Sequence, residues 1–151
     1  MKPKVRSILS FCRRTESRRG NTLIEAAFVF NILLLLSFCT VEFGYYLYAK
    51  HTIQGAAREG ARAAVVPGAT TTDVTNAVAR SLFASGMNSG TTSIDSAKFT
   101  VTLNPANPAA AAGTAIQVDV VSTMGKIGPK PLFFMSNTKS ITGSTVMRKE
   151  G

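Results

Sequence analysis

The chain has 151 residues, of which 45% are hydrophobic and 17% are charged. This length fits one domain of ordinary size, and the apolar content excludes a disordered chain. One His and two Cys are too few for the common His/Cys metal clusters or for a disulfide framework. We therefore expect neither a metal site nor a cofactor.

The formal net charge of +9 is concentrated at one end of the chain. Residues 1–20 contain seven Lys or Arg and one Glu, a balance of +6, and residues 21–151 carry the remaining +3. A basic block directly before an apolar run is typical of the cytoplasmic flank of a membrane segment. A DNA-binding domain instead spreads its basic residues over a folded face. The small charge of residues 21–151 also disfavours nucleic-acid uptake, so we expect no nucleic-acid partner.

An uncharged run of 16 residues, Ala26–Val41, follows the basic block. Its continuation to Tyr46 gives 21 residues, roughly 31 Å of helix, which matches the hydrocarbon core of a bilayer. Tyrosines at positions 45, 46 and 48 supply an aromatic belt at the far interface. The run therefore predicts a transmembrane helix, with a buried core helix as the alternative.

The distribution of Lys and Arg predicts the orientation of this helix. Seven precede the span, and three lie in the twenty residues after Tyr46. The positive-inside rule places the N-terminus in the cytoplasm and the C-terminal part outside the cytoplasm. A secretory signal fits less well, because no small-x-small pair follows the run. A lipoprotein signal fails as well, because Phe38 precedes Cys39 where a small residue is expected.

Several motifs in this chain resemble those of one protein family. Arg19-Gly20 is followed by Glu25 and the apolar run, Val41–Gly44 reads VEFG, and Ala56–Ala64 reads AAREGARAA. With the closing segment Val146–Glu150, these motifs make the chain similar to TadE-like proteins, a pseudopilin class of the tight-adherence (Tad) pilus and related secretion machinery. The Gly…Glu motif alone is weak because any prepilin carries it, whereas VEFG and AAREGARAA together are specific.

The resemblance implies a minor pseudopilin of the bacterial inner membrane that takes part in assembling a Tad-type (type IVb-like) pilus. Its implied partners are other Tad pilins or pseudopilins and the prepilin peptidase. That peptidase would cut after Gly20 on the cytoplasmic side, so that Asn21 becomes the first mature residue and Glu25 the fifth. The Glu25 carboxylate would then pair with the new α-amino group of a neighbouring subunit, since each charge is otherwise unpaired near lipid.

Two positions depart from the family pattern. Ala26 stands where processed Tad pilins usually have an aromatic residue, and Asn31 stands where the family commonly has a Pro. The sequence therefore leaves an alternative open, in which Glu25 only marks the headgroup boundary. The chain would then remain an uncleaved single-pass anchor whose exported domain binds another envelope component. Cleavage at Gly20 separates the two hypotheses.

The long helix is expected to continue beyond the membrane, because no Pro occurs between Pro3 and Pro67. Small residues at positions 49, 56, 60 and 64 line one helix face and let another helix or a sheet approach closely. Val66-Pro67-Gly68 predicts the end of the helix. The candidate subunit contacts are Glu25, Glu42, Ala56, Gly60 and Ala64.

The remaining chain predicts a small α+β domain. Thr70–Asp73 offers an N-cap for a helix from about Asp73 to Ser85. Three further segments have the period of two that is typical of half-buried strands: Phe99–Leu103, Ala115–Thr123 and Ser140–Arg148. Gly125–Pro131 predicts a loop rich in helix breakers. We expect the apolar patch Leu132–Met135 to lie under the sheet or near the membrane.

The predicted fold class is thus α+β and pilin-like. A long N-terminal transmembrane helix is followed by a short helix and a small antiparallel sheet of three to four strands. The predicted divisions are a basic leader 1–20, a helix 21–66 with its extension beyond the membrane, and an exported domain 67–151.

An enzyme is not expected. The single His, His51, lies next to Lys50 at the membrane interface, where it is solvated. The carboxylates outside the membrane share no motif spacing, and the chain has no phosphate-binding Gly loop. We therefore expect no catalytic residues and no small-molecule substrate.

Overall fold

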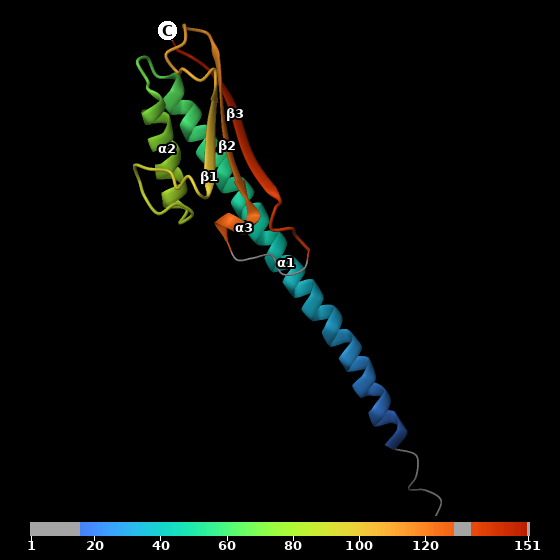
Figure 1. Ribbon diagram of the computed structural model, residues 1–151. Coiled ribbons are helices and arrows are strands. Elements are labelled where there is room, and N and C mark those ends of the chain that lie inside the picture. The colour runs from blue at the N-terminus through green and yellow to red at the C-terminus, as the bar shows by residue number, and fades with distance from the viewer. Residues whose placement is uncertain (1–15, 129–133, 151) are drawn as a thin grey trace, which may run out of the picture. The chain divides into compact units, whose positions relative to one another are not determined.

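The computed structural model describes residues 16–128 and 134–150. Their elements in chain order are α1 (Glu16–Val65), α2 (Thr71–Ala84), β1 (Phe99–Asn104), β2 (Ala115–Thr123), α3 (Met124–Ile127) and β3 (Ser140–Arg148) (Figure 1). The chain divides into two compact units, one ending at Thr40 and the other beginning at Val41, and α1 contributes residues to both. The predicted boundaries at residues 20 and 66 stay predictions.

The first unit contains the part of α1 up to Thr40, which exposes large apolar side chains on all sides. Leu23, Phe28 and Leu35, for example, are 74%, 71% and 57% exposed. The helix contains a candidate membrane span whose 18-residue window has a mean hydropathy of 2.1 and no buried residue. Because Leu, Ile and Phe are unfavourable in water, such a helix requires apolar surroundings, as the predicted membrane anchor does.

The second unit consists of a helical layer and a sheet. The strands pair antiparallel in the order β1-β2-β3, with Val101 opposite Val120 and Val120 opposite Gly143 (Figure 1). α2 and the part of α1 after Val41 contribute side chains to the same core as one face of this sheet. This arrangement confirms the predicted α+β fold with a long helix, a short helix and a small antiparallel sheet.

Small residues of α1 allow the close packing of these layers. Ala49, Ala56 and Ala64 are fully buried. A Cβ atom at Gly60 would lie 2.6 Å from a methyl group of Val78 in α2, closer than real Cβ contacts. The predicted small-residue face therefore receives both a helix and a sheet, and both belong to the same chain.

The approach of β3 to α1 depends on a second glycine. A Cβ atom at Gly143 would lie 2.6 Å from the carbonyl oxygen of Ile53. Because this neighbour is backbone, it has little freedom to move aside. Beside this contact, the Gln54 side chain accepts a hydrogen bond from Ser144 N at 3.3 Å and donates one to Ser144 O at 2.7 Å. The Gln54 amide thus satisfies backbone groups at the outer edge of β3.

α2 begins with a reciprocal cap. Thr70 is the N-cap residue, and its hydroxyl oxygen accepts a hydrogen bond from Asp73 N at 3.2 Å. The Asp73 carboxylate accepts one in return from Thr70 N at 2.9 Å. Hydrogen bonds from the Thr70 side chain and then from its backbone lower the pKa of Asp73. The predicted cap is confirmed, and the helix starts at Thr71, two residues earlier than expected.

One local prediction was wrong. Met124–Ile127 is a short helix, α3, where the sequence predicted a loop over Gly125–Pro131. Met124 and Ile127 are buried in the core, and this burial outweighs the low helix propensity of Gly125. Gly125 N also donates a hydrogen bond to Asn137 O at 3.0 Å. Residues 129–131 of the predicted loop lie outside the described residues.

Candidate functional site

The predicted processing site lies on the exposed surface of α1. Gly20, Asn21 and Glu25 are all exposed, and a Cβ atom at Gly20 would meet nothing within 4 Å. Among the described residues, no hydrogen bond or ion pair involves the Glu25 side chain. The carboxylate is therefore open to a cation from outside the described chain, such as the α-amino group of another subunit.

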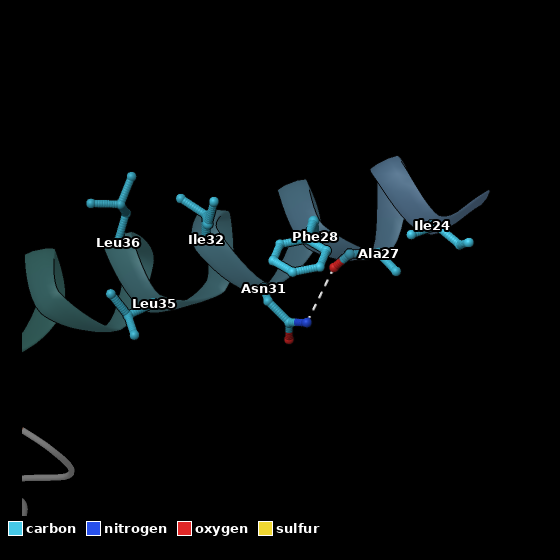
Figure 2. Close-up of a pocket in the computed structure, with 7 residues that line it drawn as sticks. All are labelled: Ile24, Ala27, Phe28, Asn31, Ile32, Leu35 and Leu36. Carbon is cyan, nitrogen blue, oxygen red and sulfur yellow. Dashed lines mark hydrogen bonds between the residues drawn. The ribbon is translucent and has the colours of Figure 1, made fainter. Parts of the chain in front are cut away.

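Beyond Glu25, one exposed face of α1 is apolar except for one amide. Figure 2 shows the side chains that line it: Ile24, Ala27, Phe28, Asn31, Ile32, Leu35 and Leu36. The Asn31 Nδ2 atom donates a hydrogen bond to the Ala27 carbonyl oxygen at 3.1 Å. Ser37 and Thr40, later in the same helix, donate their hydroxyl hydrogens to carbonyls four residues back, at 2.8 and 2.9 Å.

Glu42, in the VEFG motif, is buried with 6% of its surface exposed. Its carboxylate accepts hydrogen bonds from Phe134 N at 3.1 Å and from Met135 N at 2.7 Å. A buried carboxylate requires such donors, and bonds to an ionised group are stronger than those between neutral groups. Glu42 therefore fastens the segment that begins at Phe134 to α1. Leu132 and Phe133, the first half of the predicted apolar patch, lie outside the described residues.

Two tyrosines reinforce the attachment of α1 to the rest of the second unit. Tyr45 donates its hydroxyl hydrogen to the Ile127 carbonyl at 2.6 Å, and Tyr48 donates to the Ser85 carbonyl at 2.7 Å. The sequence suggested only an interfacial aromatic belt for them. Their hydroxyl bonds fix α3 and the end of α2 to the helix.

The far end of α1 is held by the closing segment of the chain. Lys149 is buried, and its Nζ atom donates hydrogen bonds to Val66 O at 3.2 Å and to Pro108 O at 2.5 Å. Glu150 N donates to Val65 O at 3.3 Å. The last carbonyls of a helix lack intrahelical partners and carry partial negative charge, so a cation is favourable there. The sequence marked this segment only as a closing strand.

The other predicted subunit contacts have partners within the chain. Ala56, Gly60 and Ala64 are buried under α2 and the sheet, and the Glu42 carboxylate binds Phe134 and Met135. Glu25 differs from these four residues because its side chain faces outward. Among the predicted contacts, only Glu25 is exposed.

Comparison with protein families points to the same segment. Residues 20–62 match the TadE-like protein family. The match begins at Gly20 and includes Glu25, Glu42 and most of the AAREGARAA motif, which confirms the predicted resemblance. No curated protein and no solved structure matches the chain. The matched segment therefore covers the apolar part of α1 from Gly20 and most of the part of α1 that supplies the domain core.

Within residues 16–128 and 134–150, no group of three or more His, Cys, Asp or Glu side chains is placed to hold a metal ion. His51 is exposed. The TadE-like segment offers an apolar anchor, an outward carboxylate and a helix fastened to a small domain.

Proposed function

We propose that this chain is a membrane-anchored minor pseudopilin that takes part in assembling a Tad-type pilus or a related secretion apparatus. One observation carries the proposal: a single 50-residue helix supplies both an exposed apolar anchor and the core of an α+β domain. The match to TadE-like proteins over residues 20–62 supports the same role. The proposed location is the bacterial inner membrane, with the domain outside the cytoplasm.

The attachment of the domain suits a subunit that is moved by its helix. Glu42, Tyr45 and Tyr48 bind the domain near one end of this part of α1, and Lys149 binds it near the other. A displacement of α1 after Val41 therefore carries the sheet and α2 with it. An enzyme with a mobile lid would show the opposite arrangement, with few contacts between its moving parts.

The proposed assembly contact is an ion pair at Glu25. After cleavage following Gly20, Asn21 would carry a new α-amino group four residues before this carboxylate. Within one helix the amine lies about one turn before Glu25, at ~1.5 Å of rise per residue, and a pairing inside one subunit sets no register between subunits. The amine of a neighbouring subunit can reach Glu25, and the pairing would set the axial register between subunits.

The competing function is a permanent anchor that is never cleaved. The exposed Glu25 would then mark only the headgroup boundary, and the exported domain would bind another envelope component. The fold is the same under both proposals, so the test has to address assembly.

The proposed function is tested with Glu25→Ala and Glu25→Gln in the native host. Both variants should enter the membrane and lose residues 1–20 as the wild type does, because peptidase recognition rests mainly on Gly20. Neither should be recovered with assembled pili at more than about a tenth of the wild-type level, since a buried charge left without its partner is costly. Glu59→Gln, at an exposed carboxylate on the same helix, is the matched control and should assemble normally. Normal assembly of Glu25→Ala would contradict the proposal.

A further inference from the structure

Asn31 is a polar residue of the proposed membrane helix that has no role in the proposed Glu25 contact. Its side chain lies on the exposed face of α1 among apolar neighbours, one turn after Ala27 and one turn before Leu35 (Figure 2). A carboxamide in the hydrocarbon region of a bilayer is costly, and such residues usually bind a partner.

The hydrogen bonds of Asn31 are only partly satisfied within α1. A carboxamide has two N–H donors and a carbonyl acceptor. One N–H is used in the bond to Ala27 O, and in the described part of the chain no hydrogen bond reaches the Asn31 side-chain oxygen. Ser37 and Thr40 differ, because their only hydroxyl hydrogens are already donated to Leu33 O and Leu36 O. Asn31 therefore keeps one donor and one acceptor for a group outside its own helix.

The depth of Asn31 in the membrane restricts the partner. Lipid tails offer neither donors nor acceptors, and water is excluded from the bilayer core. The partner must present both a hydrogen-bond donor and an acceptor at the same depth. A second copy inserted in the same orientation does so by symmetry, because its own Asn31 lies at that depth. Paired amides in helical interfaces behave in this way and fix a parallel register.

We propose that two copies of this chain form a parallel dimer in the membrane through this face of α1. The free N–H of each Asn31 donates to the side-chain oxygen of the other Asn31. Ala27 provides the small residue that allows the two backbones to approach, and Ile24, Phe28 and Leu35 pack around the amides. The two side chains are complementary in hydrogen bonding, because each supplies a donor for the acceptor of the other.

This dimer requires only that α1 spans the membrane. It requires neither cleavage after Gly20 nor incorporation into a pilus, so it goes beyond the proposed function. The pairing is measured on the full chain, and it can be repeated with the Gly20→Trp variant, in which cleavage is blocked. Failure of the dimer and failure of the pseudopilin role are therefore distinguishable.

The first test maps the face by disulfide cross-linking. The full chain, with Cys12→Ser and Cys39→Ser, is reconstituted into phosphatidylethanolamine and phosphatidylglycerol vesicles and oxidised with copper phenanthroline. Ala27→Cys and Leu35→Cys should cross-link efficiently. Val29→Cys and Leu33→Cys are matched controls, because they lie on the opposite side of the helix and are equally exposed to lipid. Cross-linking that is equal at all four positions, or stronger at the two controls, would overturn the proposed face.

The second test measures the contribution of the amide. Ala112→Cys, in an exposed loop, carries donor or acceptor fluorophores in the same Cys-free background, and energy transfer in vesicles reports dimer affinity. Asn31→Leu should weaken the dimer by about fivefold or more, the loss expected for interhelical hydrogen bonds in a bilayer. Asn31→Gln should restore part of it, and Ser37→Ala should change it by less than about twofold because its hydroxyl is bonded internally. A dimer of Asn31→Leu as strong as that of the wild type would overturn the proposal.

Discussion

The two parts of α1 differ in composition and surroundings although they form one helix. Before Thr40, large side chains such as Phe28 and Leu35 are exposed, whereas after Val41 small side chains such as Ala56 and Ala61 are completely buried. Bulky residues gain most from lipid contact, and small residues allow a sheet and a second helix to pack closely. Helix propensity alone therefore does not explain the side chains of either part. Their size fits lipid contact in the first part and close packing in the second.

The largest expected effect contrasts an apolar truncation in each part. Ile53 is fully buried, so Ile53→Ala should lower the free energy of unfolding of the domain by about 2–5 kcal/mol. Leu35 is 57% exposed in the first part, and Leu35→Ala should change the same quantity by less than about 0.5 kcal/mol. The measurement is urea unfolding of the detergent-solubilised chain, followed by near-UV circular dichroism. Equal effects of the two substitutions would contradict the difference in burial between the two parts of α1.

A smaller effect is expected from the carboxylate near the start of the second part. Glu42→Leu should destabilise the domain by about 1–3 kcal/mol, because Phe134 N and Met135 N lose the acceptor that binds them. Glu59→Leu removes an exposed carboxylate whose ion pair with Arg62 spans 3.1 Å, and it should cost no more than about 0.5 kcal/mol. Both are read from urea midpoints at one pH. A Glu42→Leu protein as stable as the Glu59→Leu protein would remove the anchoring role of Glu42.

The last pair of effects should differ in sign between two glycines that lie five residues apart in α1, and the stabilising effect is the smaller one. At Gly60 an added methyl group would press on Val78 and Val118, so Gly60→Ala should destabilise the domain by about 1–3 kcal/mol. At Gly55 nothing lies within 4 Å, and Gly55→Ala should stabilise the helix by about 0.5–1 kcal/mol. Thermal unfolding of the two variants against the wild type tests this. Stabilisation by both substitutions would show that α1 packs less closely than described.

Much of the fold could be predicted from local sequence patterns. The apolar run, the period of two in the strands and Thr70–Asp73 can each be recognised within one short stretch of sequence. The helix Met124–Ile127 could not be predicted in this way, because burial of its side chains in the core overrides the low helix propensity of Gly125. An element is predicted well when its own residues carry the pattern, and poorly when only its contacts with distant residues explain it.

The same limit applies to the candidate site. Gly20, Glu25 and the apolar run were recognisable as a motif, because their spacing within one segment carries the information. The bonds of Glu42 to Phe134 and Met135, and of Lys149 to Val66, join residues more than 80 positions apart. Nothing in the sequence near Glu42 distinguishes a carboxylate bound by its own chain from one that binds another subunit.

The most direct test of the central claim is the intact mass of the protein purified from its native membrane, with and without Gly20→Trp. Gly44→Trp serves as a matched control, because Gly44 is an exposed glycine of the same helix with nothing within 4 Å. The pseudopilin account predicts that the wild type and Gly44→Trp lose residues 1–20 and that Gly20→Trp retains them. A full-length mass in all three proteins would contradict it and leave a permanently anchored envelope protein.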